Sequence, residues 1–255
     1  QAAKKAGVLA AKLYPAGATT NSQTAVKSIF DFAFYVSFFP QLVAGPIVRA
    51  AEFVPQLYRE FRLRKYEFGY ALFLILNGLI KKVIISDYIS VNFVDRVFTD
   101  PLLYSGFTNL MAVYGYAIQI YCDFSGYTDI AIGVALLLGF RLPTNFLSPY
   151  KATSITDFWR RWHITLSRFL KDYIYIPLGG NRKGEFRTYS NLMATFIIGG
   201  IWHGAGWTFV FWGFLHGLAL VIHRVWSKLG FKMWTWLAWL ITVNFINIAW
   251  VCFRA

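Results

Sequence analysis

Long stretches without charged residues dominate the hydrophobic pattern of this chain. Uncharged runs extend from Leu102 to Cys122, from Leu192 to Ile222 and from Trp234 to Phe253. A further apolar stretch, from Phe68 to Ile85, is interrupted by the pair Lys81-Lys82. A helix needs roughly 20 apolar residues to cross a bilayer. The pattern therefore predicts four or five membrane-spanning segments, with some pieces that lie at the membrane interface.

The segment from Ile29 to Val48 is apolar but irregular. It contains Asp31, Pro40, Gly45 and Pro46, and proline cannot donate a backbone hydrogen bond, so a continuous helix breaks there. Irregular backbone at membrane depth is tolerated only where protein or water surrounds it. We therefore expect a broken or re-entrant element in this part of the chain.

The composition places the chain in a membrane class. Of the 255 residues, 57% are hydrophobic and 15% are charged, whereas charged residues make up about a quarter of a soluble domain. The formal net charge of +13 could suggest a nucleic-acid partner. The basic residues, however, cluster beside the apolar segments, as positive residues on the cytoplasmic side of membranes do. We expect an all-α polytopic membrane protein in contact with lipid headgroups, and no nucleic acid.

The stretch from Ser154 to Tyr173 has the pattern of one amphipathic helix. Ser154 and Asp157 are spaced as in a helix-capping box. The apolar positions share one face at the helical period, and they are Ile155, Phe158, Trp159, Trp162, Leu166, Phe169, Leu170 and Tyr173. The basic residues fall on the other face. This predicts a helix that lies in the membrane interface, with His163 at the edge of its apolar face.

His203 is the ionisable residue that draws most attention, because it lies inside the uncharged run from 192 to 222. Titratable side chains at membrane depth are costly and are usually kept for a function, and imidazole suits proton transfer near neutral pH. A buried packing role is the alternative. His216 fits a packing contact better, and His223, beside Arg224, fits a helix end.

Two further groups of polar residues leave their roles open. The turn-rich loop from Ile176 to Gly184 contains Arg182 and Lys183. It lacks the ending of a phosphate-binding P-loop, so it is either a phosphate contact or a cytoplasmic turn. Asp123, Ser125 and Asp129 follow an apolar segment, where we favour helix capping or water binding over a contact with a histidine.

The two cysteines argue against a disulfide-rich or zinc-binding protein, and the chain ends bear on whether the sequence is a fragment. Cys122 and Cys252 are far apart, so neither a disulfide framework nor a zinc site, which needs four ligands, is predicted. No metal is expected. The chain begins at Gln1 without an initiator Met and ends directly after an apolar segment. We therefore expect an internal fragment of a larger membrane protein.

Four motifs resemble those of the membrane-bound O-acyltransferase family, in its branch for bacterial polysaccharide O-acetylation and D-alanylation. They are Ser37-Phe-Phe-Pro-Gln-Leu-Val-Ala-Gly-Pro-Ile47, Tyr121-Cys-Asp-Phe-Ser-Gly-Tyr-Thr-Asp129, Asp157-Phe-Trp-Arg-Arg-Trp-His163 and Trp202-His203-Gly204. On this resemblance, residues 29–255 form part of an acyltransferase membrane domain, and residues 1–28 match the family pattern poorly.

The resemblance implies many helices around a central tunnel, with His203 as the essential histidine and His163 as the second. It implies no permanently bound cofactor. The implied activity moves an acetyl group from a cytoplasmic thioester, acetyl-CoA, toward an extracytoplasmic polysaccharide such as alginate. The implied setting is the bacterial inner membrane, with a periplasmic or membrane-anchored acetyltransferase as partner. For the phosphates of the donor, the candidate contacts are Arg160, Arg161, Arg182 and Lys183.

Two alternatives remain open at the level of the sequence. One is a transporter or acyl-group channel in which the histidines relay protons. The other is D-alanyl transfer to teichoic acid from a carrier-protein donor. His163 could orient the acyl group, donate a hydrogen bond to a developing oxyanion, or relay protons, and the residues alone do not choose among these roles.

Overall fold

The computed structural model describes residues 28–254, and all regular structure in this range is helical. The predicted all-α class is confirmed. The predicted N-terminal segment, 1–28, lies outside the described residues except for its last position. In chain order the helices are α2 (Ile29–Ser37), α3 (Phe39–Leu42), α4 (Ala50–Leu57), α5 (Lys65–Leu79), η1 (Ile80–Asp87), η2 (Ser90–Val94), α6 (Asp95–Thr99), η3 (Pro101–Leu103), α7 (Gly106–Leu137), η4 (Pro149–Lys151), α8 (Ile155–Trp159), α9 (Ile164–Leu170), η5 (Lys171–Tyr175), α10 (Glu185–His203), α11 (Trp207–Lys228) and α12 (Thr235–Arg254).

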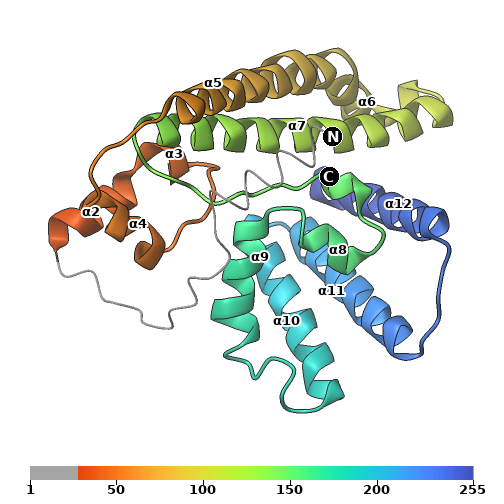
Figure 1. The fold of residues 1–255 in the computed structure, drawn as a ribbon. Coiled ribbons are helices and arrows are strands. Elements are labelled where there is room, and N and C mark those ends of the chain that lie inside the picture. The colour runs from red at the N-terminus through yellow and green to blue at the C-terminus, as the bar shows by residue number, and fades with distance from the viewer. Residues whose placement is uncertain (1–27, 255) are drawn as a thin grey trace.

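Four helices in the described range are long and apolar enough to cross a membrane. They are Lys65–Thr99, Gly106–Leu137, Trp207–Lys228 and Thr235–Arg254. Figure 1 shows that α5 and α7 run side by side, that α10, α11 and α12 form a second group, and that α8 and α9 lie where the two groups meet. These four candidates agree with the four or five spanning segments predicted, and the chain is a multi-pass membrane chain.

The first of these helices continues through the lysine pair that interrupts its apolar sequence. Residues Lys65–Thr99 form one helical rod, and its turns widen to the π form in η1 and η2. Such π turns are rare and are frequent at functional positions. Lys81 and Lys82 therefore lie within a long helix.

Glycines allow α5 and α7 to pack at close range. A Cβ atom at Gly78 would lie 2.5 Å from the carbonyl oxygen of Gly126, and one at Gly126 would lie 2.8 Å from that of Gly78. Two turns along α7, a Cβ at Gly133 would lie 2.7 Å from the carbonyl oxygen of Ala71. Small residues at such contacts let membrane helices pack tightly, and here they fix the register of the two helices.

Ion pairs cross the same interface. Lys81 donates to Asp129 at 2.6 Å, and Asn77 donates to the same carboxylate at 2.7 Å. Lys82 contacts Asp123 across the interface at 2.6 Å and Asp87 on its own helix at 2.8 Å.

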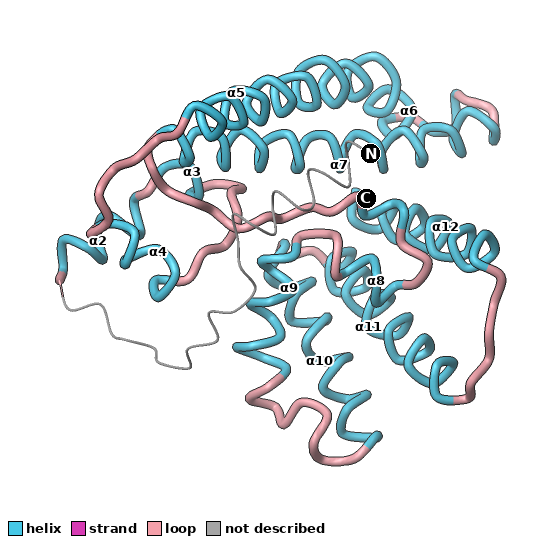
Figure 2. Tube along the Cα trace, viewed as in Figure 1, coloured by secondary structure: helices cyan, strands magenta, loops and turns pink. Residues whose placement is uncertain are grey.

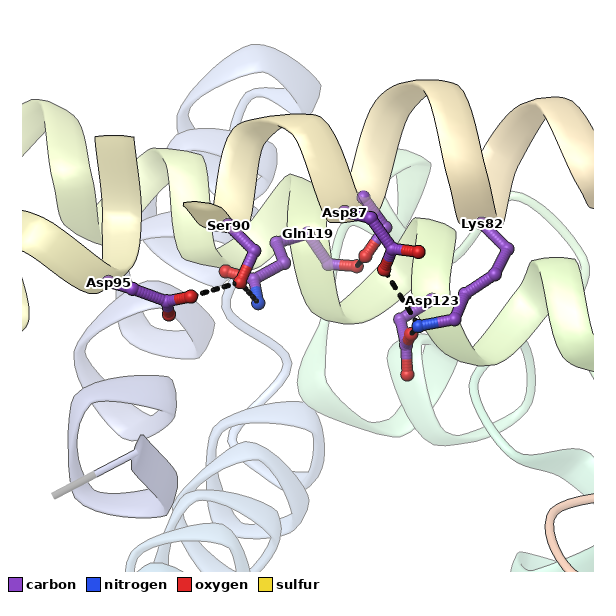
Figure 3. Close-up of polar contacts among 7 residues, drawn as sticks. Lys82, Asp87, Ser90, Asp95, Gln119 and Asp123 are labelled. Carbon is purple, nitrogen blue, oxygen red and sulfur yellow. Dashed lines mark hydrogen bonds and ion pairs between the residues drawn. The ribbon is translucent and has the colours of Figure 1, made fainter. Parts of the chain in front are cut away.

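Figure 3 shows the part of this polar seam around Lys82, which continues along the helices to Gln119, Ser90 and Asp95. Asp123, Ser125 and Asp129 therefore lie inside α7 rather than at the end of an apolar helix. The helix-capping role favoured from the sequence is wrong. The two carboxylates neutralise lysines of the neighbouring helix.

The uncharged run around His203 forms a helical hairpin. α10 ends at His203, and α11 begins at Trp207 after a turn that contains Gly204 and Gly206. A Cβ atom at Gly213 would lie 2.4 Å from the carbonyl oxygen of Phe196, so the two helices are in direct backbone contact near this turn.

Ion pairs join α10 and α11 at the end of the hairpin that lies far from this turn. Glu185, at the start of α10, pairs with Lys228 and with Arg224 near the end of α11. Hydrogen bonds from Lys228 and Arg224 lower the pKa of Glu185 to about 2. The carboxylate therefore stays charged, and the ion pairs stay formed, until the pH falls through that value. His223 lies within α11, and its ring Nδ1 is 2.9 Å from the hydroxyl of Thr156.

The stretch from Ser154 to Tyr173 is not the single interfacial helix predicted from its periodicity. α8 ends at Trp159, residues 160–163 form a turn, and the chain restarts as α9 at Ile164. The predicted N-cap is present, because the Ser154 hydroxyl accepts from the backbone N–H of Asp157 at 3.1 Å. The apolar residues Phe158, Trp159 and Trp162 are buried in the protein core. They pack against α11 and α12 instead of facing lipid.

The irregular segment from Ile29 to Val48 is broken as predicted. α2 and α3 are short helices, and the chain from Val43 to Arg49 has no regular structure. Its aromatic residues pack with Phe53 and Phe140 near the end of α7. The backbone N–H of Ile47 donates to the hydroxyl of Thr165 at 3.0 Å, which connects this segment to the first turn of α9.

Candidate active site

His163 is held in a fixed orientation at the start of α9. Its φ of 42° and ψ of 54° lie in the left-handed region, which is uncommon for a residue other than glycine and is a form of strain that gathers at functional sites. This conformation turns the chain sharply after Trp162. The side chain is 5% exposed and meets the edge of Phe124 with ring centroids 4.7 Å apart.

Asn145 determines which nitrogen of His163 carries the proton. The Asn145 side-chain oxygen lies 3.2 Å from His163 Nδ1 and accepts from the backbone N–H of Thr165 at 3.2 Å. A backbone N–H can only donate, so the atom that faces it is the amide oxygen. His163 Nδ1 must then donate to that oxygen. The neutral ring carries its proton on Nδ1 and leaves Nε2 with a free lone pair.

Asn145 is fully buried in the loop between α7 and η4, which Figure 2 shows as a long non-helical segment that returns from the end of α7 toward α8. The Thr165 hydroxyl also donates to its oxygen, at 2.9 Å. Sequence reasoning missed Asn145, because nothing in a loop sequence marks an asparagine as the partner of a histidine 18 positions away.

His203 lies at the tip of the α10–α11 hairpin among aromatic rings. Its ring centroid is 5.0 Å from Trp202, 5.1 Å from Trp212 and 5.2 Å from Phe253, with edge-to-face geometry. Within residues 28–254, the histidines whose rings make hydrogen bonds are His163, His216 and His223. Both ring nitrogens of His203 are therefore without a hydrogen-bond partner in this part of the chain.

The structure brings the two predicted histidines into one site. A series of aromatic contacts links them: Trp212 lies 6.0 Å from Trp250, and Trp250 lies 4.9 Å from Trp162, the residue before His163. His203 itself contacts Trp212, with ring centroids 5.1 Å apart, so aromatic contacts run from one imidazole to the other. The imidazole of His163 is oriented by an amide, and that of His203 has no hydrogen-bond partner among the described residues.

His216, for which the sequence favours a packing contact, belongs to the same group. It lies on α11, beyond the turn that follows His203. It is fully buried, its Nδ1 accepts from the indole N–H of Trp159 at 3.2 Å, and its ring centroid lies 4.7 Å from that of Trp212.

The four basic residues predicted for the donor phosphates are divided between two places. Arg160 and Arg161 belong to the turn that ends at His163, where Arg161 Nε contacts both carboxylate oxygens of Asp157 at 2.9 Å. Arg182 and Lys183 precede the start of α10, whose other end is His203. At a rise of about 1.5 Å per residue, the length of α10 separates this loop from His203 by about 27 Å.

The comparison with known proteins decides the family. A family model described as "MBOAT, membrane-bound O-acyltransferase family" matches residues 16–255. The chain belongs to the membrane-bound O-acyltransferase family. The resemblance found in the four motifs is confirmed.

Several proteins similar to this chain are named as enzymes that modify bacterial polymers. The chain is 53% identical over 235 residues to a peptidoglycan O-acetyltransferase of Helicobacter pylori, covering 88% of this chain and 44% of the relative. It is 44% identical over 238 residues to the probable alginate O-acetylase AlgI of Pseudomonas putida, covering 91% and 47%. A teichoic acid D-alanyltransferase of Bacillus subtilis is 29% identical over 216 residues, covering 80% and 53%. The chain thus spans about half the length of these relatives.

Proposed function

We propose that this chain forms the histidine-bearing part of a membrane O-acyltransferase. The acyl group is acetyl, the donor is the cytoplasmic thioester acetyl-CoA, and the destination is an extracytoplasmic polysaccharide. The observation that supports this most directly is the pair of histidines. Within residues 28–254, His203 has no hydrogen-bond partner on either nitrogen and lies at a hairpin tip among aromatic rings, and His163 is oriented by Asn145.

The arrangement suits acyl transfer from a thioester to a hydroxyl. A hydroxyl is a weak nucleophile, so a base that takes its proton as it attacks the carbonyl carbon speeds the reaction. In the proposal His203 is that base. The tetrahedral intermediate then collapses, the carbon–sulfur bond breaks, and the imidazolium returns the proton to the leaving thiolate. Because His163 Nε2 carries a lone pair, a neutral His163 acts as a proton acceptor or relay and cannot donate to an oxyanion.

The relatives support a bacterial polysaccharide as the final acceptor. The relative named for peptidoglycan is 53% identical and those named for alginate are 42–44% identical, so a cell-wall polymer is favoured over alginate. D-alanyl transfer rests on relatives at 28–29% identity and is the second choice. The proposal includes the bacterial inner membrane, the bilayer, and a periplasmic or membrane-anchored acetyltransferase that completes the transfer.

The test uses membrane vesicles that contain the full-length protein. Free CoA thiol and O-acetyl groups on the polysaccharide are measured after addition of acetyl-CoA. His203→Ala should abolish both signals while the amount of inserted protein stays unchanged. His223→Ala, which alters a histidine on α11 outside the site, is the matched control and should remain active. Wild-type acetylation by His203→Ala would refute the catalytic assignment. Acetyl movement without release of CoA would favour the transporter alternative.

A further inference from the structure

Two buried N–H groups next to His203 have no hydrogen-bond acceptor within the described residues. One is Nε2 of His216. Its Nδ1 accepts a hydrogen bond from Trp159 at 3.2 Å, so a neutral His216 must carry its proton on Nε2. That N–H is buried and no atom in residues 28–254 accepts from it. His216 and His163 are thus in opposite tautomers.

The second N–H belongs to the indole of Trp212. This side chain is 2% exposed, and its Nε1 also has no acceptor within residues 28–254. Trp212 lies one helical turn before His216, so both side chains project from the same face of α11. Its ring lies between the two imidazoles, with centroids 5.1 Å from His203 and 4.7 Å from His216.

A buried donor without an acceptor costs about 1–3 kcal/mol, and the aromatic rings around these two offer no strong acceptor. Each such group in a native structure calls for an explanation. Here both donors come from one helix face, and that face contacts the ring of His203. A packing role would be served as well by phenylalanine, which carries no polar atom to bury.

We propose that His216 Nε2 and Trp212 Nε1 bind the carbonyl oxygen of the acyl group during transfer. The inference rests on the proposed function and adds to it the residues that stabilise the transition state. When the hydroxyl oxygen attacks the carbonyl carbon and its proton moves to His203, the carbonyl electron pair moves onto the oxygen. The two N–H groups donate to that oxyanion. When the carbon–sulfur bond breaks, the pair returns to form the new ester carbonyl, and the thiolate takes the proton from His203.

In this scheme the three histidines have different roles, which follow from the ring nitrogen that carries the proton in each. His203 accepts the proton of the nucleophile, His163 offers a lone pair, and His216 offers an N–H. Preorganised donors in a water-poor site contribute much to acyl transfer, and loss of one costs about 10²–10³-fold in kcat. Trp159 is a positioning residue in this scheme, because its hydrogen bond keeps the proton of His216 on Nε2.

The test compares steady-state kinetics of the full-length protein in vesicles with acetyl-CoA. Trp212→Phe and His216→Phe each remove one donor and keep an aromatic ring, and each should lower kcat roughly 100-fold while KM changes less than about threefold. His216→Gln restores an N–H donor and should recover part of the lost rate. Trp239→Phe is the matched control. It removes an exposed indole of α12 that donates to the backbone of Tyr150, and it should keep wild-type kcat.

Protein amount and thermal unfolding are measured for each variant. Wild-type kcat in folded Trp212→Phe would overturn the inference, even if the His216 variants fail to fold. An equal loss in His216→Phe and His216→Gln, with lowered thermal stability in both, would assign His216 to packing and overturn its part. If His203→Ala is inactive while both donor variants keep full kcat, this inference fails and the proposed function stands.

Discussion

The amide oxygen of Asn145 lies 3.2 Å from His163 Nδ1 and holds the ring in one tautomer. The same oxygen accepts from Thr165, and the Thr165 hydroxyl accepts from the backbone of Ile47. The broken segment that contains Ile47, a loop and a strained turn thus meet at one imidazole. Orientation of an active-site histidine by a second residue has large effects on rate where it has been measured.

Asn145→Leu should lower kcat about 10–100-fold, because it removes the acceptor and frees the His163 proton to occupy either nitrogen. Asn145→Asp keeps an acceptor oxygen at the same place and should retain more of the activity. Initial rates of CoA release by the full-length protein check this. Equal activity of the leucine variant and the wild type would mean that the tautomer of His163 does not matter.

Gly78→Ala should destabilise the α5–α7 pair by about 1–3 kcal/mol, because the new Cβ would lie 2.5 Å from the carbonyl oxygen of Gly126. Gly69→Ala, on the same helix, meets nothing within 4 Å and should be neutral or slightly stabilising, since alanine favours helix. Thermal unfolding in detergent compares the two. Similar stability in both variants would contradict the close packing of these helices.

Asp129→Leu should destabilise the protein by roughly 2 kcal/mol, because it leaves the Lys81 charge without its partner in a largely buried position. The double variant Lys81→Met with Asp129→Leu should recover most of that loss. Unfolding measurements on the single and double variants give the coupling between the two residues. Additive losses would show that the two side chains act independently.

Neutralising Arg182 and Lys183 together should raise KM for acetyl-CoA far more than it lowers kcat. A remote phosphate contact binds ground state and transition state alike, and this loop lies about 27 Å from His203 along α10. Donor titrations with the full-length protein distinguish the two constants. An unchanged KM would limit the loop to membrane orientation and leave Arg160 and Arg161 as the candidates.

Lys183→Cys, in a protein with Cys122 and Cys252 replaced by serine, should resist a membrane-impermeant thiol reagent in intact cells. The expectation follows from the excess of Lys and Arg around the loop, which favours the cytoplasmic side. Labelling after the cells are opened is the control for reactivity. Labelling in intact cells would place the loop outside and remove the proposed entry of a cytoplasmic donor.

The class, the spanning segments and the two motif histidines could be read from the sequence because each rests on a local signal. The interfacial helix at 154–173 could not, since a helical period of apolar residues describes burial against protein as well as against lipid. Phe158 and Trp162 meet Trp250 and the core, and the strained backbone of His163 leaves no mark in the pattern. The ion pairs join residues 41 and 48 positions apart, and the tautomers of His163 and His216 depend on partners that only the fold assembles.

The polar seam between η1 and α7 has a consequence for how the protein is inserted into the membrane. Lys82 and Asp123 lie near the middle of two membrane-length helices, and their side chains are 42% and 49% exposed. A charged residue at the centre of a lone inserting helix costs about 2.5–3.5 kcal/mol. The first helix carries Lys81 and Lys82 there, with Asp87 as a partner for Lys82 on the same helix, and the second carries Asp123 and Asp129. Each charge is neutralised when the helices are paired, so the two should leave the translocation machinery as a joined hairpin, with the short connection at 100–105 already turned.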